Sequence, residues 1–274
     1  MANTLLPVEQ VAQVAVAQAP GLLAPLRDFA TLIPLLERPG CSREVSVPVV
    51  AAVAAVRENP VNFEAGADAV IDAVGMQPVH LSAGAHLSNN DIQDGAALGW
   101  LAASTLRALE AGIMGRVAAE LKPTNFSNTA WTGTAENFGP QAVAACRQAV
   151  PTGRRCLLLA TAAYSALAGE LKPLGNRWTL PGFVAVHEMA GLPSGVLGAV
   201  IDPAALVVCV GLPLPSVGIS ERMMVRRVPV EGLGLEILSV VWAAANNRAI
   251  FLSYDVLLAV KPASTARAAL ILTA

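Results

Sequence analysis

One stretch of the sequence begins like a zinc-binding helix. His187 and Glu188 stand at the first two positions of the H-E-x-x-H motif, in which two histidines on one helix face bind Zn²⁺ and the glutamate acts as general base. Gly191 occupies the position of the second histidine, so this ligand is missing. The alternation of Val184 and Val186 also favours a strand over a helix. We therefore predict no metal site and a structural role for His187.

A serine beside this stretch would be a nucleophile only if a base and an acid reached it in space. Ser194 lies in Gly191-Leu192-Pro193-Ser194-Gly195, one place too late for the G-x-S-x-G nucleophile elbow. His187 and Asp202 are close in sequence and could complete a triad. Any domain of this size contains such a trio by chance, so we predict a turn at Ser194 and no catalytic residues. A soluble α/β hydrolase using His187, Ser194 and Asp202 is the alternative from another class of protein.

The glycines and cysteines of this sequence do not form the motifs that bind nucleotides or zinc. The glycines at 112–115 and 232–234 form neither a G-x-G-x-x-G nor a Walker sequence, so we predict no nucleotide cofactor. No C-x-x-C pair occurs among the cysteines, and we interpret them as small buried hydrophobes rather than as zinc ligands or a disulfide framework. They are Cys41, Cys146, Cys156 and Cys209.

The charge pattern argues against a protein that reads nucleic-acid sequence. The net charge is −2, arginines number 15 and lysines three, and no basic run is longer than the pairs Arg154-Arg155 and Arg226-Arg227. A protein that recognises a nucleic-acid sequence normally presents a cluster of basic residues on one face. We interpret both pairs as solvated surface, with a neighbouring molecule's carboxylates or DNA as the alternative contacts.

The composition indicates a chain that hides much of its surface. Hydrophobic residues make up 54% and charged residues 14%, against about 25% charged in a typical soluble protein. Such a chain either enters a membrane or associates with copies of itself. In the most apolar stretch, 196–219, Pro203, Pro213 and Pro215 break any helix of the about 20 residues needed to cross a bilayer. We therefore predict self-association. No basic segment precedes an apolar one at the N-terminus, so we expect no secretory signal and a cytoplasmic start.

The first third of the chain predicts an arm, a ribbon and a long helix. Residues 1–28 are predicted to be an arm that packs on another molecule. Arg43–Val49 has the alternation of a strand, and Met76–Ser82 is its predicted partner in a two-stranded ribbon, which should rest on a neighbouring molecule because an isolated ribbon is marginally stable. N-cap residue types at Ser88–Asp91, followed by apolar residues at helical spacing from Leu98 to Leu121, predict a helix of about eight turns.

The remaining sequence predicts a mixed α+β architecture. Lys122–Thr134 is predicted to be a loop. Helices are predicted at Pro140–Val150 and Ala162–Leu167, with a short one at Asp202–Ala205. Strands are predicted at Arg155–Leu159, Val184–Glu188, Gly198–Ile201, Leu206–Val210, Arg222–Val230, Leu235–Trp242, Ala249–Val260 and Ala268–Thr273.

The order of these elements, from Phe29 to Ala274, resembles that of the major capsid proteins of tailed double-stranded DNA bacteriophages, a fold shared with herpesvirus capsid floors and encapsulins. Six phrases carry the resemblance: Val45-Ser46-Val47-Pro48 with Val79-His80-Leu81, Leu87-Ser88-Asn89-Asn90-Asp91, Arg155-Cys156-Leu157-Leu158-Leu159-Ala160 with Ala162-Ala163-Tyr164, Leu180-Pro181-Gly182-Phe183, Gly198-Ala199-Val200-Ile201-Asp202-Pro203-Ala204-Ala205-Leu206, and Asn246-Asn247-Arg248.

The resemblance implies an N-terminal arm at 1–28 and an extended loop at 43–84. It further implies a peripheral domain, with its spine helix, at 29–42, 85–122 and 222–260. An axial domain would comprise 123–221 and 261–274. In such a protein, pentamers and hexamers form around the axial domains and build an icosahedral shell that encloses phage DNA.

The resemblance also implies partners and a location. The expected partners are copies of the chain itself, a portal, a separate scaffolding protein and decoration proteins, with non-specific contact to packaged DNA and no membrane. The expected location is the virion capsid, assembled in the host bacterial cytoplasm. The alternative with the same fold is an encapsulin-type compartment that holds an enzyme cargo.

Two departures from the family's pattern limit what the resemblance carries over. Some members cross-link their shells through a lysine on the extended loop, but no lysine lies between Arg43 and Asp91, so we predict no such cross-link. Some members carry an N-terminal scaffolding segment of domain size. The residues before Phe29 are too few to form one, so scaffolding is expected to be a separate protein or absent.

Overall fold

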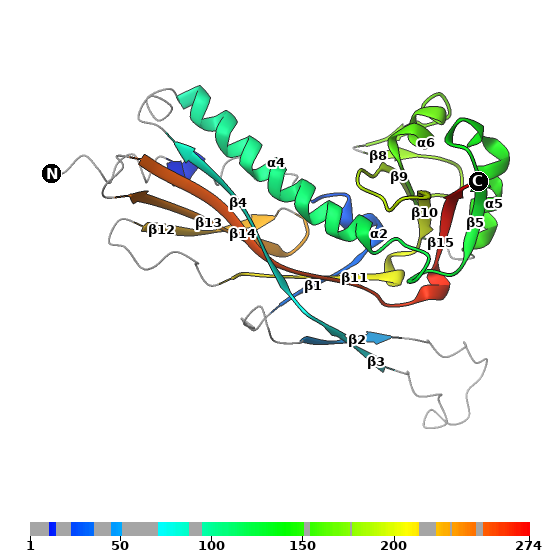
Figure 1. The fold of residues 1–274 in the computed structure, drawn as a ribbon, viewed down its shortest axis with the longest axis horizontal. Helices are drawn as coiled ribbons and strands as arrows, with labels where there is room; N and C mark the ends of the chain where they lie inside the picture. The colour runs from blue at the N-terminus through cyan, green and yellow to red at the C-terminus, as the bar shows by residue number, and fades with distance from the viewer. Residues whose placement is uncertain are drawn as a thin grey trace.

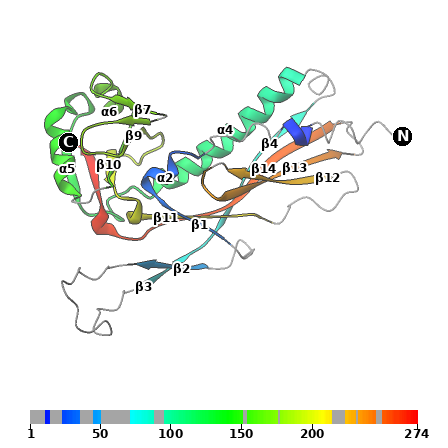
Figure 2. The same cartoon turned by 180° about the vertical axis from the view of Figure 1, so that it is seen from behind.

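Two β-sheets that share one hydrophobic core make up most of the protein (Figures 1 and 2). The computed structural model describes residues 11–14, 23–35, 45–50, 71–87, 95–150, 154–175, 177–213, 223–230, 232–244 and 249–274. This mixed α+β architecture confirms the predicted fold class.

The larger body is built on a six-stranded sheet that the helix α4 (Gly95–Ala119) covers on one face. Its strands follow the order β1 (Thr31–Pro34), β11 (Leu206–Gly211), β14 (Ala249–Pro262), β13 (Leu235–Ala244) and β12 (Met223–Val230), and β4 (Val79–Leu87) pairs with β14 as well. All neighbours are antiparallel except β1 and β11. Ile113 and Val117 of α4 share the core with Leu252 and Tyr254 of β14. The helix therefore buries its apolar stripe on the sheet.

The second body is a seven-stranded sheet with both faces covered. Its order is β5 (Thr129–Gly133), β15 (Ala268–Thr273), β10 (Val196–Ile201), β6 (Cys156–Leu159), β9 (Ala185–Glu188), β8 (Arg177–Thr179) and β7 (Lys172–Leu174). Leu157 and Leu159 pack in the same cluster as α5 (Pro140–Ala149) and α6 (Thr161–Ala166), whereas Cys156 and Leu158 enter the main core. Because both faces are buried, β6 and β10 are continuously apolar.

A two-stranded ribbon projects from the larger body (Figure 1). It consists of β2 (Val45–Val50) and β3 (Ile71–Met76), and Val45 lies opposite Met76. The predicted partner strand Met76–Ser82 is wrong beyond Met76, because residues from Val79 onward pair with β14. Pro78 stands between the two strands, and its missing N–H suits a break in pairing. The predicted tip between the strands, 51–70, lies outside the described residues.

Most other predicted elements are confirmed. The long helix is α4, whose 25 residues make about seven turns, while the N-cap residues predicted at 88–91 lie outside the described residues. The predicted loop at 122–134 is wrong at its end, because β5 adds to the sheet in parallel with β15. The short strands β1, β7 and β8 were not predicted. Single-turn 3₁₀ helices lie at Ala135–Asn137 (η2), Pro203–Ala205 (η3) and Thr265–Arg267 (η4).

The described parts of the predicted N-terminal arm pack on their own chain. Val11 and Ala12 are buried, as are Leu23 and Leu26. All four belong to the main core, and Leu26 opens the short helix α2 (Leu26–Phe29). The prediction that this segment packs on another molecule is therefore wrong for these residues, because a buried face is available within the subunit.

Strands β4 and β11 belong to one sheet, although the sequence placed them in different predicted segments of the chain. β11 was predicted with the axial segment 123–221, and the first six residues of β4 with the extended loop 43–84. Both strands pair with β14 in the six-stranded sheet. Their apolar runs resemble those of β10, and such a run does not specify which sheet a strand joins. In the described part of the chain, no helix is long and apolar enough to cross a membrane.

Candidate functional site

The three residues of the alternative catalytic triad lie apart. Ser194 is exposed in the turn before β10, whereas Asp202 is buried just after the end of that strand. A strand of this length spans about 20 Å, so the serine and the aspartate sit at opposite ends of it. His187 lies on β9, where its Nε2 is 3.0 Å from Oδ2 of Asp28. The geometry therefore does not form a serine nucleophile site.

The residues that resembled a zinc motif lie on a strand, as predicted. His187 and Glu188 are consecutive in β9, so their side chains point to opposite faces of the sheet. Glu188 accepts a hydrogen bond from the Thr161 hydroxyl at 2.6 Å. Within the described residues, no group of three or more His, Cys, Asp and Glu side chains could hold a metal ion.

A buried ion-pair cluster surrounds Asp28, whose side chain is 4% exposed. One guanidinium nitrogen of Arg177 lies 2.9 Å from Oδ1, Nε2 of His187 lies 3.0 Å from Oδ2, and Nε of Arg27 is more distant at 3.9 Å. The Cys156 thiol donates to the Asp28 backbone carbonyl at 2.9 Å. Helix α2 and strands β6, β8 and β9 therefore meet at one aspartate.

The Asp28 cluster is built to hold elements together. Both carboxylate oxygens have a cationic or hydrogen-bonding partner, as a buried charge requires. The His187 ring also lies against Phe29, with ring centroids 6.0 Å apart. This geometry fixes the N-terminal segment on the seven-stranded sheet and leaves Asp28 no free oxygen with which to act as a general base.

A second buried carboxylate lies near the base of the ribbon. Asp255 is 3% exposed. Its Oδ1 is 3.1 Å from Nε2 of His80, and its Oδ2 accepts from the Ser253 hydroxyl at 2.7 Å. His80 is on β4, four residues after the end of β3. Here the carboxylate stands between serine and histidine, so the histidine does not contact the hydroxyl as it would in a catalytic triad.

The ribbon itself is attached to the sheet by further contacts. Nζ of Lys261 donates to the Gly75 carbonyl at 2.7 Å. Met76 is 3% exposed and packs with Val207, Cys209 and Ala259. These contacts set the direction in which the ribbon leaves the larger body.

The described cysteines are buried thiols without nucleophilic character. Burial raises the pKa of Cys146 and of Cys156 to about 12, and that of Cys209 to about 11. The Asp28 carboxylate adds to the increase at Cys156. Only the thiolate is a good nucleophile, so these residues act as small hydrophobes, as predicted.

The arginine pairs differ in their surroundings. Arg227 on β12 lies 3.6 Å from Glu236 on β13, and both side chains are about half exposed, so this pair contributes little to stability. Arg154 is exposed. Arg155 donates to the Arg147 backbone carbonyl, and its Nε is buried without a hydrogen-bond partner among the described residues.

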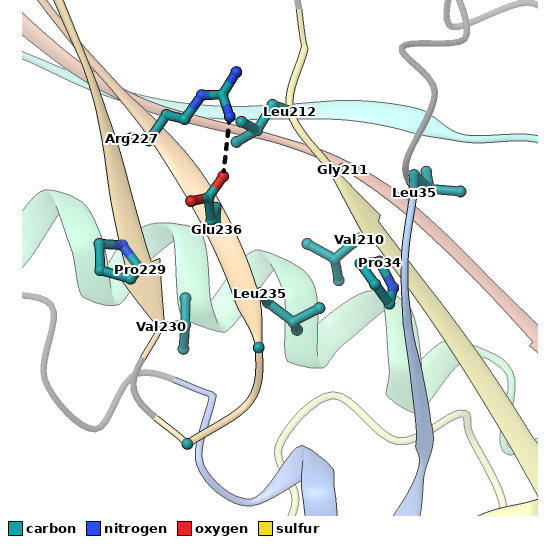
Figure 3. Close-up of a pocket in the computed structure, with 12 residues that line it drawn as sticks. Pro34, Leu35, Val210, Gly211, Leu212, Arg227, Pro229, Val230, Leu235 and Glu236 are labelled. Atoms are coloured by element: carbon teal, nitrogen blue, oxygen red, sulfur yellow. Dashed lines mark ion pairs between the residues drawn. The ribbon is translucent and has the colours of Figure 1, made fainter.

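A pocket of about 570 Å³ opens where β14 changes its partner from β13 to β11 (Figure 3). The pairing with β13 ends at Asp255 and that with β11 begins at Leu257, so the two strands diverge. The lining is Pro34, Leu35, Val210, Gly211, Leu212, Arg227, Pro229, Val230, Gly232, Gly234, Leu235 and Glu236. Its ionisable residues, Arg227 and Glu236, pair with each other. The pocket therefore contains no acid, base or nucleophile free for chemistry.

The surface offers apolar contacts instead. Among the described residues, the exposed large hydrophobics are Val79, Trp100, Leu174, Trp178 and Val225, and Trp100 on α4 is 80% exposed. Tryptophan is enriched at the centres of protein interfaces. These side chains lie on both sheets and on the long helix, so apolar surface is distributed around the subunit.

Sequence reasoning missed the residues that organise these clusters. Asp28, Arg177, His80 and Asp255 come from distant parts of the chain. The only available signal was a few acidic residues in otherwise apolar segments, such as Asp255 within 249–260. An isolated charge in a buried strand indicates a partner, but it does not identify that partner.

Comparison with solved structures identifies the fold. The capsid of an empty GTA particle matches over 91% of this chain and 89% of its own, with a TM-score of 0.55 and 14% identity. A structure of Gordonia phage Cozz matches over 91% and 86%, with a TM-score of 0.52 and 12% identity. A virus-like particle from Pyrococcus furiosus matches over 96% and 98%, with a TM-score of 0.51 and 11% identity.

These likenesses confirm the predicted fold. The chain shares its fold with the GTA particle capsid and with the Gordonia phage structure over about nine-tenths of its length. No protein-family profile matches the sequence, and no curated protein matches it either. At this level of identity the likeness establishes the fold, and function must be argued from the geometry.

Proposed function

We propose that this protein is the major capsid protein of a tailed bacteriophage, a structural subunit that assembles into an icosahedral shell around double-stranded DNA. The observation that carries the proposal is the match of 91% of the chain, as one arrangement, to the capsid of an empty GTA particle. In the described residues, no group of three or more His, Cys, Asp and Glu side chains could hold a metal ion, and Ser194 and Asp202 lie at opposite ends of β10.

The ribbon supports assembly because it needs a neighbour. Two strands alone are marginally stable in water, and β2–β3 projects beyond the larger body (Figure 2). Its base is held by Lys261 and by the burial of Met76. A ribbon directed in this way can lie across an adjacent subunit without first losing much conformational freedom, which lowers the entropic penalty of association.

The composition supports the same role. A chain with 54% hydrophobic and 14% charged residues suits obligate interfaces, which resemble a domain core divided in two. Trp100 and Trp178 are exposed in the subunit, and a closed shell would cover them. The slightly acidic, patch-free chain would also tolerate packed DNA without binding it tightly.

The two sheets suggest how the proposed domains are divided. We assign the seven-stranded sheet with α5 and α6 to the axial domain, and the six-stranded sheet with α4 to the peripheral domain, with β2–β3 as the base of the extended loop. Strands β4 and β11 belong to the peripheral domain on this assignment, because both pair with β14.

The proposal includes a non-enzymatic role and the usual partners of a shell. Copies of the chain would form pentamers and hexamers, with a portal, a separate scaffolding protein and decoration proteins as further partners. The shell would assemble in the host bacterial cytoplasm. The separation of Ser194 from Asp202 along β10 argues against the hydrolase alternative.

Electron microscopy of the protein expressed alone tests the proposal. Hollow polyhedral particles or capsomer rings are expected at neutral pH. A subunit that stays monomeric at every concentration and salt condition tried would refute the proposal. Particles that enclose a co-purified protein instead of accepting DNA would favour the encapsulin-type compartment, which has the same fold.

A further inference from the structure

A short hairpin at one edge of the seven-stranded sheet exposes two large apolar side chains. The hairpin is formed by β7 and β8, in which Pro173 lies opposite Trp178 and Leu174 opposite Arg177. Leu174 is 64% exposed and Trp178 is 47% exposed. Most apolar side chains of this size are buried elsewhere in the described residues. The hairpin thus presents apolar surface on both of its faces.

The hairpin is held in place by contacts with the rest of the subunit. Trp178 pairs through its backbone with Val186 of β9. Arg177 binds the buried carboxylate of Asp28 at 2.9 Å. Gly175 in the turn has a φ of +60°, a value that the tight turns of two-residue hairpins require. Leu174 and Trp178 are therefore presented by a fixed element, as interface anchors are.

The opposite edge of the same sheet is complementary in charge. That edge is β5, followed by η2, and it lies on the other side of this body from the hairpin (Figure 1). Residues 124–146 contain no lysine or arginine, and their one charge is Glu136. Glu136 is exposed and has no ion pair within the described part of the chain. The hairpin residues 172–179 carry Lys172 and Arg177 and no acidic residue.

We propose that the β7–β8 hairpin of one copy docks on the β5–η2 edge of the next copy, with Leu174 and Trp178 as apolar anchors and Lys172 facing Glu136. The inference rests on the proposed shell function, and it names the surfaces that join neighbouring axial domains. Because the two edges differ, the contact is head-to-tail, and such contacts close into rings when the rotation between copies allows it.

The docking occurs through side chains rather than through an added strand. Pro173 in the middle of β7 has no N–H to donate to a further strand. Edge prolines of this kind prevent open-ended sheet growth. The sheet can therefore meet a neighbour's edge without fusing with it.

The first test introduces a charge at the apolar anchor. Leu174→Asp is expected to abolish rings and shells at concentrations where the wild type assembles, while the subunit keeps its circular dichroism spectrum and melting temperature, since exposed positions tolerate substitution. Leu174→Met retains the apolar contact and should assemble like the wild type. Rings formed by Leu174→Asp at wild-type concentrations would overturn the proposal.

The second test reverses the two charges. Lys172→Glu and Glu136→Lys should each raise the concentration needed for ring formation by about tenfold, and the doubly reversed chain should return to within about twofold of the wild type. An equal mixture of the two single variants should form hexameric rings, because strict alternation of the two variants places opposite charges at every contact. Glu170→Lys, at the base of the hairpin, is the matched control and should leave ring formation unchanged.

The outcomes separate the two proposals. Wild-type shells together with no effect of Leu174→Asp would refute this docking contact and leave the shell function standing. Single charge variants that assemble normally, or a control that fails as they do, would also refute it. A wild-type chain that never assembles would instead refute the proposed function.

Discussion

Replacing Asp28 by asparagine should destabilise the subunit much more than the loss of a surface ion pair would. The substituted side chain would retain the shape of the original but would leave Arg177 and His187 without their shared negative charge. Breaking a buried pair by removing one partner costs about 3–5 kcal/mol. Because Arg177 is 28% exposed and Arg27 is 49% exposed, water relieves part of this penalty, so we expect about 3 kcal/mol.

Urea unfolding of the dissociated subunit, followed by far-UV circular dichroism, measures this change. At this chain length about 3 kcal/mol corresponds to a decrease of roughly 6–12 °C in melting temperature. Arg177→Met should cost less, since Asp28 keeps His187, and the double variant should show a coupling energy of about 1–3 kcal/mol between Asp28 and Arg177.

Arg227→Met is the matched control because its partner Glu236 is 44% exposed, and it should change the free energy of unfolding by less than about 0.5 kcal/mol. If the effect of Asp28→Asn lies within that same small range, the Asp28 ion pairs contribute no more than a surface pair and do not hold α2 on the sheet.

Three further results are expected from the same subunit. Gly198→Ala should destabilise the subunit by more than about 2 kcal/mol, because an added Cβ would lie 2.3 Å from the Leu158 carbonyl oxygen. Gly112→Ala has open space around the added Cβ and should stabilise α4 by about 0.5–1 kcal/mol. Equal effects of the two substitutions in urea unfolding would contradict this. The free energy of unfolding should fall as the pH rises from 9.0 towards 12. Burial raises the pKa of the three described cysteine thiols in the folded state only, so the unfolded state loses these protons at lower pH. A free energy of unfolding that does not change across that pH range would disprove this expectation. Particles boiled in denaturant should run as single subunits, and a covalent ladder on the gel would show that a cross-link forms without an extended-loop lysine.

Local pattern was sufficient where one periodicity dominated. The apolar spacing from Leu98 to Leu121 predicted α4, and the apolar runs at Arg155–Leu159 and Leu206–Val210 predicted the strands β6 and β11. Gly191 in place of a histidine was enough to dismiss a zinc helix, and the residue is indeed in a turn after β9. These features depend on neighbours within a few positions, which is what a sequence records directly.

Long-range packing decided the rest. The sequence alone determined the α+β class, the long helix, the order of the strands along the chain and the shortage of charge that calls for covered surfaces. Only the tertiary structure decided that β11 joins β14 rather than β10, that Val11 and Ala12 lie in their own chain's core, and that Asp28 meets Arg177 and His187. The apolar sequence of a buried strand does not specify which sheet the strand joins, and the sequence around a buried charged residue does not identify the residue that pairs with it. Both choices depend on side chains far apart in the sequence, which meet only when the two sheets close over their shared core.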